Sequence, residues 1–341
     1  MAATGKALVL MNLGSPDSPE VKDVRRYLNE FLMDSRVLDF PAVFRFPLVR
    51  GIITPFRAPN SAKAYSKVWR KDGSPLIVLT RQLADAVQQQ FDYPVRTAMR
   101  YGNPSPRKVF DELLQADPGL KEVILFPLYP HYTMSSYETA VAYARAIHKK
   151  YKYPFSLKFV SPFYNHPDYI AALAARIAPY LEQGYDKILF SYHGLPERHM
   201  RKDDETISRY QNGAKDTGFV MPAINYQKQC HETTRLVAEK LSLPENRYET
   251  TFQSRLKQAG NEWIKPYTAP RLETLPADGV KKLLVVCPAF INDCLETLEE
   301  IAMEGKHAFE SAGGEELVYI PCLNDSKPWT DTVVAWVKAM L

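Results

Sequence analysis

The stretch DKILFSYHGLP, residues 186–196, decides the fold class of this chain. It opens with a largely apolar run over residues 188–192, and His193 with Gly194 ends that run. Short runs that are apolar on both faces and stop at glycine or proline are typical of buried parallel strands. The pattern therefore places an imidazole, the side chain that titrates nearest neutral pH, at the end of a predicted strand.

Seven further runs of the same kind occur along the chain, each followed by a longer segment compatible with a helix. They are KALVLMNLGSP (6–16), VRTAMRYGNP (95–104), EVILFPLYP (122–130), FSLKFVSPF (155–163), YETTFQSR (248–255), KLLVVCPAF (282–290) and ELVYIPCLN (316–324). The eight runs divide four and four, and the last three of each set start about 27 to 34 residues apart. This alternation predicts an α/β protein of two similar Rossmann-like domains, each with a four-stranded parallel sheet flanked by helices.

The length of 341 residues and the hydrophobic content of 45% also suit two domains. We expect the first over residues 1–165 and the second over 166–330, with 331–341 as the end of a C-terminal helix. Ligands of open parallel sheets bind beyond the carboxyl ends of the strands. A crevice between two such domains is therefore the expected pocket, and His193 lies at such a strand end.

Composition and motifs exclude several classes of function. The 43 cationic and 39 anionic residues give a net charge of +4, which is typical of a mildly basic surface and not of a nucleic-acid-binding tail. Neither G-x-G-x-x-G nor G-x-x-x-x-G-K-[ST] occurs, which argues against a dinucleotide or nucleoside triphosphate site.

The N-terminus and the cysteines indicate the compartment. A strand pattern begins within six residues of Met1, which leaves no room for a signal peptide, and no apolar run reaches the ~18 residues of a membrane span. The four cysteines form no C-x-x-C pair, which favours reduced thiols over a metal cluster. They are Cys230, Cys287, Cys294 and Cys322. A cytoplasmic protein is expected.

The segment NDCLETLEEIAMEGK, residues 292–306, is predicted to form an acidic helix after the seventh strand. Asn292 or Asp293 would cap it, and a buried stripe would follow. That stripe consists of Leu295, Leu298 and Ile301, and the carboxylates at i, i+4 and i+8 are Glu296, Glu300 and Glu304. A line of carboxylates suits a divalent cation, whereas a solvated acidic face is the alternative.

The segment from Phe40 to Arg57 mixes apolar residues with Arg45, Arg50 and Arg57, and prolines interrupt it. It could be a helix packed over the first domain. We favour the second interpretation, a pocket lip that touches a bilayer surface and collects a poorly soluble ligand.

Seven motifs, in order between about residues 6 and 325, resemble those of the ferrochelatase family, whose members insert Fe(II) into a porphyrin at the last step of haem synthesis. They are NLGSPDSPEVKDVRRYLNEFLMDSRVLD, DGSPL, RYGNPS, LYPHYT, SYHGLPERH, TFQSR and DCLETLEEI. The resemblance implies a chelatase-like pair of Rossmann-like domains with the porphyrin in the cleft between them. It also implies protoporphyrin IX and Fe²⁺ as substrates.

The resemblance also assigns residues. His193 matches the catalytic histidine and Glu296 the carboxylate that faces it across the macrocycle, both able to handle metal, while Asp293 and Glu300 match further members of the acidic track. The porphyrin pocket is expected from Leu13, which matches an apolar residue on the ring face, and from Arg57, Ser74, Arg100, Tyr101 and Trp263. For Arg100 an internal carboxylate is the alternative partner to a propionate, and Tyr101 and Trp263 would otherwise be core aromatics.

The implied enzyme requires no cofactor, because Fe²⁺ is its substrate. The C-terminus TVVAWVKAML lacks the cysteine-rich tail that holds a 2Fe-2S cluster in some relatives, which argues against such a cluster. Cys294 stands where some members carry a histidine. A monomer or homodimer is expected, without nucleic acid and with peripheral contact at the inner face of the cell membrane.

Other functions remain open at this point. A coproporphyrin ferrochelatase or another class II tetrapyrrole chelatase would share the fold, and a two-domain ligand-binding protein would share the cleft. The sequence also leaves open which of His193 and Glu296 takes protons from the porphyrin and which handles the metal.

Overall fold

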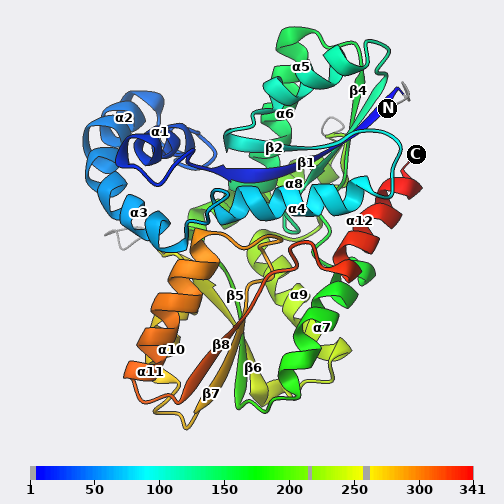
Figure 1. Ribbon diagram of the computed structural model, residues 1–341. Helices are drawn as coiled ribbons and strands as arrows, with labels where there is room; N and C mark the ends of the chain where they lie inside the picture. Colours follow the sequence, from blue (N-terminus) through cyan, green and yellow to red (C-terminus); the bar gives the residue numbers. More distant parts are fainter. Residues whose placement is uncertain (1–4, 214–216, 256–261, 341) are drawn as a thin grey trace. The chain divides into compact units, whose positions relative to one another are not determined.

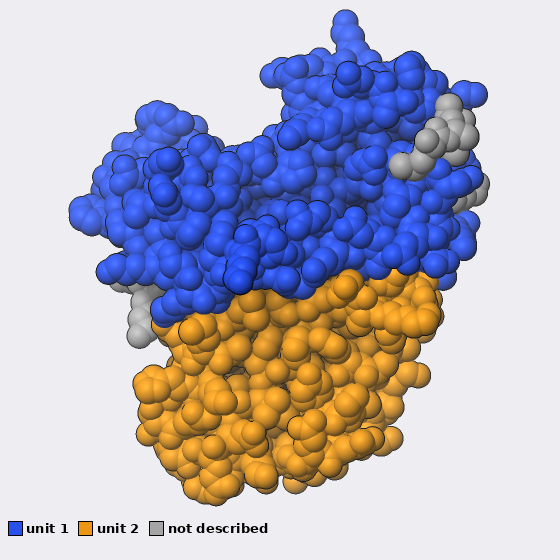
Figure 2. All heavy atoms as spheres, viewed as in Figure 1, with its two compact units in different colours: residues 1–128, 134–160, 333–341 blue, residues 129–133, 161–332 orange. Residues whose placement is uncertain are grey.

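The computed structural model describes residues 5–213, 217–255 and 262–340. They form two compact units, shown in different colours in Figure 2. Unit 1 comprises residues 1–128, 134–160 and 333–341, and unit 2 comprises 129–133 and 161–332. The short segment 129–133 and the C-terminal residues are thus the places where the units depart from two consecutive halves of the chain.

Unit 1 is built on a parallel four-stranded sheet of order β2-β1-β3-β4. Its strands are β1 (Lys6–Ser15), β2 (Val95–Gly102), β3 (Glu122–Pro127) and β4 (Ser156–Phe159). In the central strand, residues 7–11 are all buried, and Leu8 pairs with Val95 on one side and Ile124 on the other. This burial on both faces explains the unbroken apolar run in the sequence.

Unit 2 repeats the arrangement with the order β6-β5-β7-β8, again all parallel. Its strands are β5 (Lys187–His193), β6 (Tyr248–Gln253), β7 (Lys282–Val286) and β8 (Glu316–Ile320). In both units the first strand of the set lies between the second and third. The predicted fold class, two similar four-stranded parallel α/β sheets, is confirmed.

Helices cover the sheet of unit 1 and extend past its end. They are α1 (Val21–Leu32), α2 (Ala42–Pro47), η1 (Leu48–Ile53), α3 (Thr54–Val68), α4 (Pro75–Gln88), α5 (Pro106–Ala116), η2 (Met134–Glu138) and α6 (Thr139–Tyr151), and α12 (Lys327–Ala339) joins this unit from residue 333. Figure 1 shows α1, α2 and α3 gathered beyond the carboxyl end of β1. None of the described helices is long and apolar enough to cross a bilayer.

Helices also flank the sheet of unit 2. They are α7 (Pro167–Leu181), α8 (Glu197–Gln211), α9 (Tyr226–Lys240), η3 (Glu245–Arg247), α10 (Thr268–Thr274), η4 (Glu296–Gly305) and α11 (Lys306–Ser311). In Figure 1, α10 and α11 lie on one side of the strands and α7 and α9 on the other. Leu189, Val285 and Phe309 are among the buried residues that pack β5, β7 and α11 into one core.

The acidic segment after β7 differs from the expected α-helix. Residues Glu296–Gly305 form a π-helix, in which hydrogen bonds join residue i to i+5, and α11 continues from it. The wider turn changes which residues face inward, so Ile301 is buried while Leu295 and Leu298 are only half-buried. Glu304 is exposed, and the predicted straight line of three carboxylates is wrong at its third member. A second π-helix, η2, follows β3 at the corresponding place in unit 1.

Candidate functional site

His193 is the last residue of β5, as the sequence predicted, and its side chain is half-buried. Its Nδ1 lies 2.7 Å from the carbonyl oxygen of Gly194. A carbonyl oxygen only accepts hydrogen bonds, so Nδ1 carries the proton and the lone pair is on Nε2. Among the described residues Nε2 has no hydrogen-bond partner, and it can take a proton or bind a metal ion.

Gln253, a strand-end residue to which the sequence assigns no role, joins the elements that carry His193 and Glu296. Its backbone carbonyl accepts a hydrogen bond from the Gly194 N–H at 2.7 Å, and a Cβ at Gly194 would lie 2.7 Å from the same oxygen. Only glycine fits there. The buried Gln253 amide donates through Nε2 to the Glu296 carbonyl at 2.9 Å and accepts from Ser191 at 2.7 Å. One residue therefore fixes both the turn after His193 and the start of η4.

Glu300, one turn along η4, is held by Ser254. The Ser254 backbone N–H donates to one carboxylate oxygen at 2.7 Å and its hydroxyl to the other at 2.5 Å. Ser254 reaches this position with a φ of 63°, in the left-handed region. Burial raises the pKa of Glu300 above its ordinary value, the Ser254 hydrogen bonds and the nearby His193 oppose the rise, and Glu296 adds to it. Glu300 therefore interacts electrostatically with both His193 and Glu296, and it holds a proton more readily than an exposed glutamate.

Asp293 is buried, and protein groups use both of its carboxylate oxygens. Oδ2 accepts from the Asn324 side chain at 2.7 Å. Oδ1 accepts from the Thr297 hydroxyl at 3.1 Å, from the Cys322 N–H at 3.3 Å and from the Tyr319 hydroxyl. Its side chain thus ties the loop after β7 to the end of β8 and does not cap η4, whose preceding residue is Leu295. The predicted N-cap is wrong because these side-chain partners occupy the carboxylate.

Cys294 lies between Asp293 and Glu296 in the sequence and is buried. Burial raises the pKa of its thiol, and the neighbouring Glu296 raises it further, so the group is a thiol and not a thiolate near neutral pH. Among the residues that the structure describes, no three His, Cys, Asp or Glu side chains are arranged to hold a metal ion together.

Trp263 supports the turn that follows His193. It forms a β-bridge with Pro196, and the next residue, Ile264, donates its N–H to the Leu195 carbonyl at 3.0 Å. A Cβ at Gly194 would lie 3.5 Å from Cε3 of the indole ring, so the ring packs on that glycine. The buried Nε1 has no partner within the described ranges. Trp263 and His193 thus belong to one local structure in unit 2.

Arg100 and Tyr101 of unit 1 both bind Asp34, a residue that sequence analysis did not select. Arg100 makes an ion pair with the Asp34 carboxylate and donates from Nε to Thr139 at 2.8 Å, while the fully buried Tyr101 donates its hydroxyl to Asp34 at 2.8 Å. Burial alone would raise the pKa of Asp34, but hydrogen bonds from Thr139 and the Arg36 N–H, with Arg100, lower it below its ordinary value. The internal carboxylate considered as the alternative partner of Arg100 is therefore present.

The other predicted residues of unit 1 lie at the carboxyl end of its sheet and on the helices near it. Leu13, near the end of β1, is half-buried, and its N–H donates to the Asn12 side chain at 2.8 Å. Ser74 is buried at the start of α4, and Arg57 is exposed on α3. The predicted residues thus fall in two groups, one in each unit.

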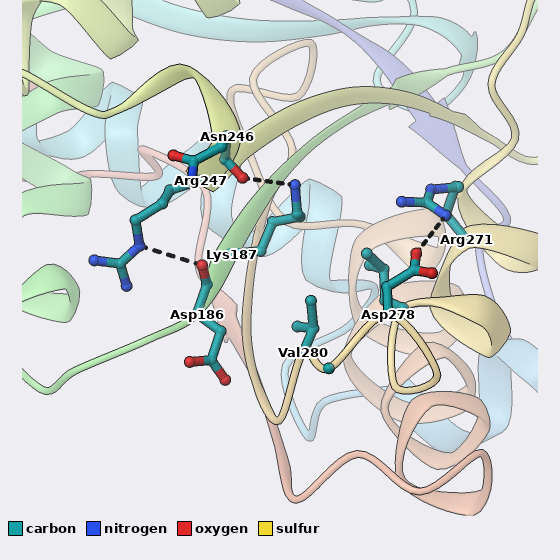
Figure 3. Close-up of a pocket in the computed structure, with 9 residues that line it drawn as sticks. Asp186, Lys187, Asn246, Arg247, Arg271, Asp278 and Val280 are labelled. Atoms are coloured by element: carbon teal, nitrogen blue, oxygen red, sulfur yellow. Dashed lines mark hydrogen bonds and ion pairs between the residues drawn. The ribbon is translucent and has the colours of Figure 1, made fainter.

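A separate polar pocket of about 480 Å³ lies at the amino ends of the unit 2 strands (Figure 3). Its charged groups are already partnered. Lys187 donates to the Asn246 carbonyl at 2.9 Å, and Arg271 pairs with Asp278 at 3.3 Å and with both oxygens of Glu249. His193 is at the other end of β5, so this pocket is not the candidate site.

The candidate site in unit 2 combines the open imidazole nitrogen of His193 with Glu300, a carboxyl of raised pKa that interacts electrostatically with both His193 and Glu296. Such a set can accept protons and offer one nitrogen and one oxygen to a divalent cation. A profile of the ferrochelatase family matches residues 5–341. The chain belongs to the ferrochelatase family. As a ferrochelatase it is an enzyme that inserts iron into protoporphyrin for haem synthesis.

Ferrochelatases of other organisms match this chain over almost its whole length. That of Pseudomonas entomophila is 48% identical over 330 residues, covering 96% of each chain. That of Opitutus terrae is 46% identical over 341 residues, covering 98% of each. Among solved structures, "SirB from Bacillus subtilis with Fe3+" superposes with a TM-score of 0.52 at 10% identity, covering 98% of this chain and 94% of that one. At this identity the likeness to SirB concerns the fold alone.

Proposed function

We propose that His193 and Glu296 act from opposite faces of a distorted protoporphyrin IX ring while Fe²⁺ enters it. The observation that carries this proposal is the joint made by Gln253, which holds the residue after His193 and the main chain of Glu296 at one end of the sheet. Two groups that must act on one ring have to be held in fixed register, because small errors of position cost large factors in rate.

The reaction requires both a base and a metal ligand. Each Fe²⁺ replaces the two inward pyrrole protons of the free porphyrin, so two protons leave for every metal that enters, and the metal must lose bound water. Nε2 of His193, which is open, would take one of these tasks. The carboxylate of Glu296, which the Cys294 thiol contacts, would take the other. Glu300, with its raised pKa, is suited to hold a departing proton, and Asp293 supports the acidic loop. A pocket shaped for the bent ring would stabilise the transition state over the flat substrate.

For the porphyrin pocket we propose different roles for the residues of unit 1. Leu13 would pack on the ring face. The exposed Arg57 and the hydroxyl of Ser74 suit the propionates, whereas Arg100 and Tyr101 would line the wall through their network with Asp34. Trp263 would form a wall in unit 2, next to the turn after His193.

We also propose how the enzyme stands toward iron–sulfur clusters, the membrane and other copies of itself. Iron enters as a substrate; the absence of a 2Fe-2S cluster remains a prediction, which visible and EPR spectra of anaerobically purified protein test. The segment from Phe40 to Arg57 would be the lip that contacts the inner face of the cell membrane. A monomer or homodimer also remains a prediction, tested by sedimentation velocity.

One assay tests the catalytic proposal. Anaerobic Fe²⁺ and protoporphyrin IX are mixed with the protein, and the loss of free-base absorbance is followed; coproporphyrin III is run in parallel. We expect faster insertion into protoporphyrin, and insertion lost in His193→Ala and strongly reduced in Glu296→Gln. A preference for coproporphyrin III would assign the enzyme to that substrate, and full activity in His193→Ala would contradict the assigned roles.

A further inference from the structure

The peptide group between His193 and Gly194 is held at both of its polar atoms. Its N–H donates to the Gln253 carbonyl of β6 at 2.7 Å, and its carbonyl accepts a hydrogen bond from the Tyr226 hydroxyl at 2.9 Å. The N–H and C=O of a trans peptide point in opposite directions, so these two partners hold the group from two sides. The next carbonyl, that of Gly194, accepts from Nδ1 of the imidazole itself.

Tyr226 is the first residue of α9 and is buried, with 4% of its surface exposed. The helix starts at this residue because Asn225 caps it. The Asn225 side-chain oxygen accepts from the Lys228 N–H at 3.2 Å, and its amide nitrogen donates to both carboxylate oxygens of Asp204 on α8 at 3.0 Å. The cap fixes the first turn of α9 and therefore the position of the phenol.

A buried imidazole, His131, packs against the Tyr226 ring. The two rings lie edge to face, with centroids 5.8 Å apart and planes at 76°. Nε2 of His131 lies 2.9 Å from the Thr233 hydroxyl, whose single proton is directed to main-chain carbonyls, one of them that of Tyr164. The imidazole is therefore the donor. Burial lowers the pKa of His131 to about 3, so this neighbour of the phenol stays uncharged.

The hydroxyl of Tyr226 is a permanent donor. A carbonyl oxygen only accepts, so the phenol proton lies on the His193 carbonyl. Burial raises the pKa of Tyr226, and the fully buried thiol of Cys230, one turn along α9, lies against the hydroxyl and raises it further. The phenol thus keeps its proton. A hydrogen bond in such a dry, low-dielectric place is costly to lose.

We propose that Tyr226 is a positioning residue for iron insertion, whose hydroxyl holds the His193–Gly194 peptide so that the His193 proton stays on Nδ1 and the lone pair on Nε2. A tilt of this peptide group changes ψ of His193 and φ of Gly194, and so moves the Gly194 carbonyl relative to the imidazole. Gln253 alone holds only the N–H side of the group. The inference rests on the role proposed above for the open Nε2.

The kinetic test compares Tyr226→Phe, which removes only the hydroxyl, with Tyr192→Phe. Tyr192 is the matched control because it is fully buried, also packs edge to face on His131, and pairs its hydroxyl with that of Thr234 at 2.9 Å. In Tyr226→Phe we expect kcat for anaerobic iron insertion to fall about tenfold and KM to change less than about twofold, because only the alignment of the imidazole is affected. Tyr192→Phe should leave both constants nearly unchanged.

A second measurement needs neither porphyrin nor iron. Proton–nitrogen NMR spectra of the full chain labelled with ¹⁵N-histidine, at about pH 8 where an ordinary imidazole is neutral, show which ring nitrogen carries the proton. The His193 signals are those missing from His193→Ala. We expect the Nδ1–H form in the unmodified protein and in Tyr192→Phe, and a mixture with the Nε2–H form in Tyr226→Phe. Loss of packing alone would lower the urea midpoint without changing the tautomer.

The outcomes separate this inference from the proposed function. An unchanged His193 tautomer in Tyr226→Phe would overturn the inference, and so would an unchanged kcat in an active enzyme or equal losses of kcat in the two variants. If the unmodified protein inserts no iron, the proposed function fails, and the tautomer in Tyr226→Phe still decides whether the phenol positions the imidazole.

Discussion

The two units share one strand order but place different chemistry at the same strand end. In unit 1, Leu13 and Gly14 lie just before the end of β1 at Ser15, and in unit 2, β5 ends at His193, which Gly194 follows. Each glycine lets the neighbouring strand approach closely. A Cβ at Gly14, where φ is 107°, would lie 1.8 Å from the Tyr101 carbonyl oxygen, and the corresponding distance at Gly194 is 2.7 Å to Gln253. Both glycines thus allow a close approach of backbone, Gly14 with a positive φ and Gly194 without one. The preceding side chain is apolar in unit 1 and an imidazole in unit 2.

The acids of the two units are also treated differently. Asp34 of unit 1 has a buried arginine, a tyrosine and a threonine as partners, which lower its pKa and lock the carboxylate as an ion. Glu300 of unit 2 receives only neutral donors from Ser254, and burial raises its pKa. A buried acid with a matched cation is a structural anchor, whereas one without a cation can exchange protons. The difference supports the proposal that unit 2 carries the proton chemistry.

The largest expected effect is on the imidazole. His193→Ala should reduce the rate of iron insertion by about 10²- to 10⁴-fold, because a positioned acid–base group typically contributes that factor. His307→Ala, at an exposed position of the same unit, is the matched control and should keep its rate. Leu13→Ala should mainly raise KM. Anaerobic initial rates measure all three, and equal losses in His193→Ala and Leu13→Ala would erase the distinction between the two strand ends.

The next effect concerns the anchor of unit 1. Asp34→Asn should destabilise the protein by about 3–5 kcal/mol, because it leaves the buried Arg100 charge without its partner. The side chains of this pair are only 11% and 5% exposed. Asp331→Asn, which breaks an exposed pair with Lys327, should cost less than about 1 kcal/mol. Urea unfolding measures both, and a small cost for Asp34→Asn would show that its network is not an anchor.

A smaller effect is expected from the close approach in unit 2. Gly194→Ala forces its Cβ against the Gln253 carbonyl oxygen and should shift His193. A displacement of about 1 Å lowers kcat by up to about 100-fold, with little change in KM. Gly51→Ala has no atom within 4 Å of the added Cβ and serves as the control. Unchanged kcat in Gly194→Ala would mean that the joint with Gln253 does not set the position of the imidazole.

The smallest effect is on the pH dependence of stability through Glu300. Its folded pKa is raised, so the folded state favours the protonated acid, and its contribution to stability is lost as pH rises from the unfolded pKa through the folded one. Glu300→Gln removes this titration. Urea unfolding from acid to neutral pH should therefore show the variant gaining stability relative to the unmodified protein as pH rises, and parallel curves would be inconsistent with a raised pKa.

The architecture could be predicted from the sequence because a buried parallel strand requires a run of apolar residues. All eight predicted strands are present, and the break at His193 marks the true end of β5. Resemblance supplied the candidate residues of the site. Asp34 was missed because its partner Arg100 is 66 residues away, and nothing local in the sequence signals an ion pair of that range.

The course of the acidic segment could not be predicted from spacing. Glutamates four residues apart are compatible with both an α-helix and a π-helix, and only packing decides between them. Gln253 and Ser254 were recognisable as strand-end residues, but a neutral amide and a hydroxyl have no sequence pattern that indicates a positioning role. Their importance follows from the partners that the fold brings to them, Glu296 and Glu300.

The hydrogen bond from Gln253 to η4 ends on the main chain of Glu296 and not on its carboxylate. Replacing that side chain therefore leaves this contact with the backbone in place. In the proposed mechanism, position 296 is accordingly a place where the acid could be exchanged for a softer or a neutral donor to change which metal the enzyme accepts, with this backbone contact preserved.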